Sequence, residues 1–340
     1  MENSPVLPKE IQVKYDDKRF PKIWHAVLGA ALMYVPIYTV LFLIIINLGT
    51  DYSVLFNTEF GSDMFSSILS QFFAVLIIPI LLLLITKRDI KATLRLNKNL
   101  DILQVLLLAV FSLCIFFLLQ IINGIFITGI SGFLGEPVQS NGITDATSIT
   151  QLLFEIVIIG GLSAICEEIF FRGFVLRAFE RKSPIVAIIM SSLIFAIMHG
   201  NLQQIFYAFL CGIILGTVVI LTDSLLAGCM IHFTLNTLSV IISYPPINSI
   251  YIDFANNYRY IFSYVVMLAL PTVSLIAMAL FVSYTLSKNK KIYGKNVPTD
   301  LQYPSLMPKE QQWEKVIEII SWVIFILTNV FCMLINWYVE

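Results

Sequence analysis

The sequence has 340 residues, of which 58% are hydrophobic and only 13% are charged, with a mean hydropathy of +0.86. A soluble domain carries roughly twice that share of charged residues, so the surplus of apolar side chains indicates that the bilayer is the solvent. The formal net charge of -1 gives no basic excess, so we expect no nucleic-acid partner. Long apolar runs without alternation predict an all-α, polytopic helical membrane protein rather than a β-barrel.

A membrane-spanning helix needs about 20 mostly apolar residues, and the sequence offers nine such candidates. One of them, the fifth, is short, and the fourth ends in charged residues. We therefore expect about eight or nine transmembrane helices, with some central helices tilted or partly submerged. In chain order the candidates are 24–48, 64–86, 101–128, 150–171, 185–199, 203–222, 225–243, 261–286 and 316–337.

The loops differ sharply in their basic residues. Loops 87–98 and 287–295 are rich in Lys and Arg, whereas 49–63 and 129–149 contain neither. Basic loops stay on the cytoplasmic side, which predicts a multi-pass protein of the cell membrane with a cytoplasmic N-terminus.

We expect the chain to divide into three consecutive regions. Residues 1–149 hold a cytoplasmic N-terminal segment and helices 1–3, and residues 150–243 hold helices 4–7 with the ionisable residues. Residues 244–340 hold helices 8–9 and a cytoplasmic linker.

Ionisable residues occur inside the fourth span, where the bilayer penalises charge and such groups indicate function. Glu167 and Glu168 are consecutive, and Arg172 follows four residues after the second. That spacing favours an ion pair between Glu168 and Arg172, while Glu167 points roughly 100° away around the helix, toward a different partner. The alternative is an ordinary charged cluster at the cytoplasmic end of a helix.

Two of the three histidines also lie in apolar helices. His199 follows Phe195 by four residues at the end of the fifth span, and Asn236 follows His232 by four residues in the seventh. One buried histidine is more often a core residue than a catalyst. Polar groups at depth must pair with one another, however, so three such elements in successive spans indicate a common site.

Together the three patterns, EExxxR, FxxxH and HxxxN, resemble the motifs of the CPBP family, the CAAX proteases and bacteriocin-processing enzymes also called Abi proteins. The local sequence around Glu167 is similar to that of the prokaryotic branch, and the resemblance covers roughly residues 150–243. It implies an intramembrane endopeptidase that hydrolyses a membrane-associated peptide or protein. By this resemblance Glu167 activates the water, His199 holds the same water, and His232 and Asn236 stabilise the oxyanion.

The resemblance assigns supporting roles to Glu168, Arg172 and Phe195, which would fix the helix or contact the substrate. No cofactor is expected, with zinc on Glu167, His199 and His232 as the alternative, because members of the family are also described as metalloproteases. We expect cleavage near the cytoplasmic leaflet, where the Glu167 end of the fourth span lies in this topology.

Two other functions stay open at this point. The protein could act without proteolysis, as a membrane scaffold or regulator that partners a sensor kinase or confers bacteriocin immunity. A transporter with a buried proton-relay carboxylate is the third reading, but the sequence lacks the internal symmetry typical of that class. The sequence leaves open the substrate, the cleavage site and the oligomeric state.

Overall fold

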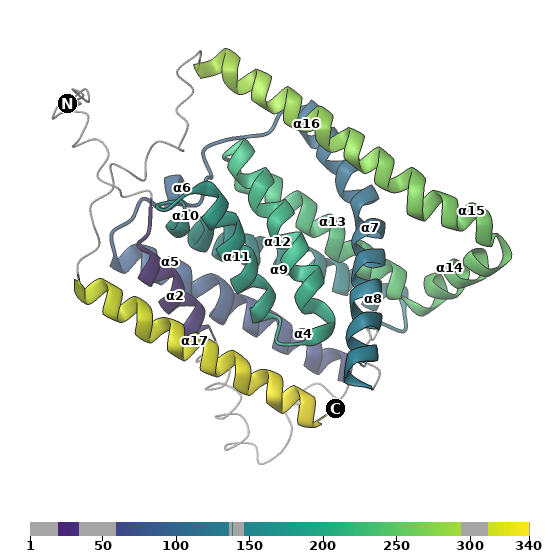
Figure 1. Cartoon of the computed structure of the whole chain (residues 1–340), viewed down its shortest axis with the longest axis horizontal. Helices are drawn as coiled ribbons and strands as arrows, with labels where there is room; N and C mark the ends of the chain where they lie inside the picture. The colour runs from purple at the N-terminus through teal and green to yellow at the C-terminus, as the bar shows by residue number, and fades with distance from the viewer. Residues whose placement is uncertain (1–19, 34–58, 136–137, 139–145, 294–311, 340) are drawn as a thin grey trace.

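The structure is a computed structural model, and it describes residues 20–33, 59–135, 138, 146–293 and 312–339. Every regular element among these residues is a helix, as Figure 1 shows. The predicted all-α class is therefore confirmed. Four of the helical segments, labelled η, are π-helical.

The helices follow one another with short connections through most of the chain. In order they are α2 (Ile23–Leu32), α4 (Glu59–Leu69), η2 (Ser70–Leu76), α5 (Ile77–Ile85), α6 (Ile90–Thr93), α7 (Ile102–Leu134), α8 (Ile149–Glu155), η3 (Ile156–Leu162), α9 (Ser163–Glu168), η4 (Ile169–Val175), α10 (Leu176–Phe179), α11 (Pro184–Met198), α12 (Leu202–Thr222), α13 (Leu225–Ser243), α14 (Pro245–Asn257), α15 (Arg259–Tyr264), η5 (Val265–Ala269), α16 (Leu270–Tyr293) and α17 (Gln312–Val339).

Six helical runs in the described part of the chain are long and apolar enough to cross a membrane. They correspond to six of the nine predicted spans and confirm a polytopic membrane protein. The six are Asp63–Ile85, Ile102–Leu134, Ile149–Phe179, Leu202–Thr222, Leu225–Ser243 and Arg259–Asn289.

The other three predicted spans differ in how far the structure tests them. Helix α11 covers the fifth with 15 residues, about 22 Å of helix, which is shorter than the bilayer core. The first begins as α2, and residues 34–48 of it lie outside the described residues. Helix α17 covers 316–337. The count of eight or nine and the three-part division of the chain stay predictions.

Close contacts between helix backbones fix the relative positions of the elements that carry the site. A Cβ built on Gly212 of α12 would lie 2.8 Å from Cα of Ser192 on α11, so these two backbones touch because the glycine has no side chain. A Cβ on Gly160 of η3 would lie 2.6 Å from Oγ1 of Thr237 on α13. The first contact holds α11 against α12, and the second holds α13 against η3, which directly precedes the helix that carries the two adjacent glutamates.

A partly buried ion cluster joins the ends of α6, α10 and α12. Arg95 pairs with Glu180, and its Nε lies 3.0 Å from Oδ1 of Asp223. Arg177 Nη1 lies 2.8 Å from the other Glu180 oxygen, and Lys98 Nζ lies 3.2 Å from Asp223. Burial alone would raise the pKa of Glu180, but the charges of Arg95 and then Arg177 outweigh it and hold that pKa below its ordinary value.

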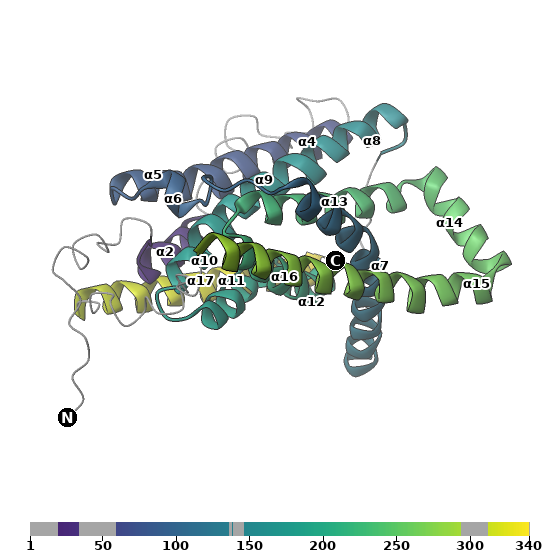
Figure 2. The same ribbon diagram turned by 90° about the horizontal axis from the view of Figure 1, so that it is seen from above.

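This cluster marks one end of the bundle. Figures 1 and 2 both place α6 and α10 at the opposite end of the molecule from α14 and α15, which extend beyond the other helices. Paired charges belong at a membrane–water interface rather than in hydrocarbon, so we expect this end of the helices at one membrane surface.

Candidate active site

The two adjacent glutamates lie on α9 between two π-helical segments. A π turn closes its hydrogen bond one residue later than an α turn, and such turns are frequent at functional sites. In η3 the carbonyl of Ile159 accepts a hydrogen bond from Nδ2 of Asn236 at 3.0 Å. This hydrogen bond ties α13 to the π-helical segment that precedes the two glutamates.

Glu168 is fully buried and anchors the inner part of the site. Arg172 Nη1 donates to Oε1 of Glu168 at 2.8 Å, and both side chains have no exposed surface. Nδ1 of His232 lies 2.9 Å from the same oxygen. The i,i+4 ion pair expected from the sequence is present, and Glu168 also orients a histidine from a different helix.

Glu167 points to a different set of partners, as its position on the helix predicted. Nε2 of Gln71 donates to Oε1 of Glu167 at 2.8 Å, and Nε2 of His232 lies 3.6 Å from Oε2. The side chain of Glu167 is 15% exposed, whereas that of Glu168 is fully buried. His232 thus bridges the carboxylates, with Nδ1 toward Glu168 and Nε2 toward Glu167.

His199 is held by its own helix. Its Nδ1 lies 2.8 Å from the carbonyl oxygen of Phe195. A carbonyl oxygen only accepts hydrogen bonds, so we assign the proton to Nδ1, which leaves the lone pair on Nε2 of a neutral ring. Gly200, with φ of 66°, ends α11 directly after His199 and turns the chain into α12.

The ring of Phe195 packs against three other side chains of the site. Its ring lies edge-on to His199 and His232, with centroids 4.8 and 5.7 Å away. The guanidinium carbon of Arg172 lies 4.4 Å from the centroid of the same ring. One aromatic ring therefore limits the rotation of both imidazoles and gives the buried cation a favourable face.

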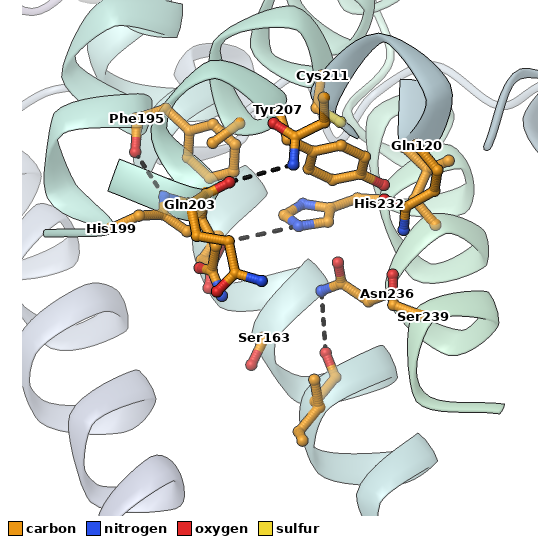
Figure 3. Close-up of a pocket in the computed structure, with 16 residues that line it drawn as sticks. Gln120, Ser163, Phe195, His199, Gln203, Tyr207, Cys211, His232, Asn236 and Ser239 are labelled. Carbon is orange, nitrogen blue, oxygen red and sulfur yellow. Dashed lines mark hydrogen bonds and ion pairs between the residues drawn. The ribbon is translucent and has the colours of Figure 1, made fainter. Parts of the chain in front are cut away.

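A cavity of about 310 Å³ brings the four predicted catalytic residues together. Glu167, His199, His232 and Asn236 all line it, as does Phe195, and Figure 3 shows the two histidines and Asn236 around the same space. Glu168 and Arg172 do not line the cavity and lie behind His232, so the structure separates the supporting pair from the groups that face the cavity.

Sequence reasoning missed Gln71 and the uncharged polar groups of the cavity. Gln71 comes from the second predicted span, 96 residues before Glu167. The sequence does contain a signal for Gln71, because an amide side chain inside an apolar span needs a polar partner. The cavity also has three carboxamides in its wall: those of Gln120 and Asn123, past the middle of α7, and that of Gln203, in the first turn of α12.

A metal site needs three ligands that converge on one point. Among the residues described by the structure, no group of three His, Cys, Asp or Glu side chains could hold a metal ion. The placement of Glu167, His199 and His232 therefore does not meet the three-ligand requirement of a catalytic zinc site. The zinc alternative stays a prediction, and no step below goes through a metal.

Residues 149–238 match the family described as "Type II CAAX prenyl endopeptidase Rce1-like". The matched segment carries most of the residues that line the cavity, while Gln120 and Asn123 precede it and Ser239 follows it. Members of this family are peptide hydrolases, so the match supports a membrane-embedded peptide hydrolase. The match covers about a quarter of the chain and contains Glu167, His199, His232 and Asn236. No curated protein and no solved structure gives a match to the chain.

Proposed function

We propose that the protein is an intramembrane endopeptidase that hydrolyses a peptide bond of a membrane-associated peptide or protein through water activated by Glu167. One observation carries the proposal. The carboxylate of Glu167 and Nε2 of His232 lie 3.6 Å apart in the wall of a cavity that His199 and Asn236 also line. A base and hydrogen-bonding groups that face one space are what peptide hydrolysis requires.

The first step begins with a water molecule beside Glu167. Glu167 takes one proton from the water, and Nε2 of His199 accepts a hydrogen bond from the second. The water oxygen then attacks the carbonyl carbon of the substrate, forming a C–O bond while the carbonyl π electrons move to oxygen. Gln71 holds the other oxygen of Glu167 at 2.8 Å, which fixes the direction of the base.

The oxyanion needs hydrogen-bond donors that are already in place. Asn236 gives one amide N–H to the Ile159 carbonyl and keeps a second for the oxyanion. Nδ1 of His232 faces Oε1 of Glu168, and a proton on its Nε2 would point into the cavity and donate to the oxyanion. In an apolar cavity these donors act more strongly than in water.

The second step breaks the peptide bond. Glu167 passes its proton to the amide nitrogen, the oxyanion re-forms the carbonyl, and the C–N bond breaks to leave an amine and a carboxylic acid. The carboxylate of Glu167 is then restored, so it serves as base and then as acid.

The test compares the peptides that cells release when they express the wild type or Glu167→Gln at equal levels. The variant keeps the shape of the side chain and removes the base, so we expect fragment production to fall by about 10²- to 10⁴-fold. Asp253→Asn, the same chemical change at an exposed position of α14, is the matched control and should behave as wild type. Equal fragments from wild type and Glu167→Gln would refute the proposal and favour a scaffold or regulator.

A further inference from the structure

The long helix formed by α15, η5 and α16 changes in character along its length. In its middle, side chains that the rest of the protein leaves exposed are aliphatic, among them Leu275 and Leu280. Around the start of α15 there are three exposed tyrosines: Tyr258, Tyr260 and Tyr264. Aliphatic side chains suit the hydrocarbon of a bilayer, whereas tyrosine is enriched where the bilayer meets water. The surface of this helix therefore indicates where the hydrocarbon ends.

The length of this helix agrees with the thickness of a bilayer. Lys288 lies near the far end of α16. The next residue, Asn289, donates a hydrogen bond to the carbonyl oxygen of Leu221, two residues before Asp223 of the ion cluster. Tyr264 is roughly 36 Å along the helix from Lys288, and the hydrocarbon core of a bilayer is about 30 Å thick. We therefore expect the tyrosines at the membrane surface opposite the ion cluster.

Helix α14 has one apolar face and one polar face. Residues at positions i, i+3, i+4 and i+7 of a helix share a face. In α14 these positions hold Ile247, Ile250, Tyr251 and Phe254. The opposite face holds Ser249, Asp253, Asn256 and Asn257. A helix divided in this way is suited to lie in the plane of a membrane interface, with its polar face toward water.

The protein covers only part of the apolar face of α14. The ring centroid of Phe262 on α15 lies 5.2 Å from that of Tyr251. The ring centroids of Phe254 and Tyr258 are the same distance apart. These contacts join α14 and α15 into a hairpin, but no residue of either helix is buried, and Ile250 is 68% exposed. A helix of 13 residues is marginal in water by itself, so a further apolar surface is needed to stabilise α14.

We propose that α14 and α15 form a hairpin that anchors the protein in the lipid interface, at the membrane surface opposite the ion cluster. Figures 1 and 2 both show these two helices extending beyond the others. Ile250 and Tyr260 lie between the lipid headgroups and the acyl chains. The exposed guanidinium of Arg259, whose carbon is 5.6 Å from the ring centroid of Tyr260, lies near the lipid phosphates.

A lipid surface suits the hairpin better than a protein partner does. The exposed band of α15 continues directly into the exposed aliphatic side of α16, so one surface covers both. The anchor goes beyond the proposed endopeptidase function and does not depend on it. Because α14 follows α13 after a single residue, the anchor also holds the depth of the helix that carries His232 and Asn236.

Power-saturation EPR on the full chain in liposomes tests the depth of the hairpin without any need for activity. A spin label on a cysteine collides with oxygen in hydrocarbon and with a soluble nickel chelate in water. Two controls set the limits: Leu275→Cys, exposed on α16, and Lys91→Cys, exposed in the basic loop. We expect intermediate oxygen-to-nickel ratios for Ile250→Cys and Tyr260→Cys, and the low ratio of the loop for Asn256→Cys on the polar face. Wild-type protein taken through the labelling gives the baseline for the native cysteines.

Three results at Ile250→Cys would overturn the proposal. A ratio equal to that of Lys91→Cys would place the hairpin in water, and a ratio equal to that of Leu275→Cys would place it in the hydrocarbon. Few collisions with either reagent would show that a second copy of the chain covers the apolar face.

A second measurement asks whether the tyrosines hold the hairpin at this depth. Tyr260→Ser with Tyr264→Ser removes two aromatic anchors, so the label at Ile250→Cys should shift toward the ratio found in water. Ser249→Ala with Asn257→Ala, on the polar face of α14, is the control and should leave that ratio unchanged. An unchanged ratio after the loss of both tyrosines would show that the protein alone sets the depth, and the anchor would be refuted.

Discussion

Replacing Gly228 by alanine should disable the site without adding charge or polarity. A Cβ at this position of α13 would lie 2.5 Å from Oε2 of Glu168 and 2.8 Å from Cγ2 of Val219. Ordinary van der Waals contact begins at 3.4 Å, so the carboxylate must move by roughly 1 Å. That carboxylate holds Nδ1 of His232 at 2.9 Å, and the histidine would lose its orientation.

A misplacement of this size costs about 10²-fold in rate, and overpacking costs about 1–3 kcal/mol of stability. We expect both effects when purified Gly228→Ala is compared with wild type by fragment production and by Tm in detergent. Gly124→Ala is the matched control, because a Cβ on Gly124 of α7 meets nothing within 4 Å.

A second variant separates the two contacts of the added methyl group. In Gly228→Ala with Val219→Ala the clash with the Val219 side chain is removed, while the clash with Glu168 remains. We expect part of the lost Tm to return and the rate to stay low. If Gly228→Ala were as active and as stable as Gly124→Ala, the placement of Glu168 against α13 would be refuted.

Three other measurements test separate parts of the structure. Gln71→Leu removes the hydrogen bond to the Glu167 carboxylate and should lower kcat about 10- to 100-fold, while an unchanged kcat would show that this bond does not orient the base. Arg172→Met strands the buried Glu168 charge and should cost about 3–5 kcal/mol, whereas adding Glu168→Gln should recover at least half of the lost Tm; no recovery would contradict the pair. Glu180→Gln tests linkage: the lowered pKa of Glu180 stabilises the fold above the ordinary value of 4.5, and this stability is lost as the pH falls through the lowered pKa. The variant should have a lower Tm at pH 7 and a smaller fall in Tm on acidification, and equal falls in the two proteins would refute this account.

Much of the site could be predicted because spacing within one helix fixes a face. Residues four apart share a face, so the Glu168–Arg172 pair and the divergence of Glu167 followed from the 3.6-residue turn. The apolar runs likewise fixed the six long helices, since a bilayer-spanning segment needs length and hydrophobicity alone.

Contacts between helices could not be predicted in the same way. Rotation and depth of one helix against another depend on the packing of many side chains. The sequence therefore did not indicate that Gln71 meets Glu167, that His232 lies between both carboxylates, or that Gly228 touches Glu168. The π-helical segments on either side of α9 also have no simple sequence signal, although they set the position of the glutamates.

The arrangement explains why two adjacent glutamates need not share one role. Glu168 is buried, and both an arginine and a histidine hold its Oε1, so it has no access to a substrate in the cavity. Glu167 is one residue away, lines the cavity and keeps some exposure. Because His232 contacts both carboxylates through opposite ring nitrogens, any shift of Glu168 reaches Glu167 through that ring. Loss of activity after a change at Glu168 is therefore expected even if Glu167 alone performs the chemistry. The Tm distinguishes the two roles. Glu167→Gln should keep the wild-type Tm, whereas a variant of Glu168, which supports the site, should have a lower Tm.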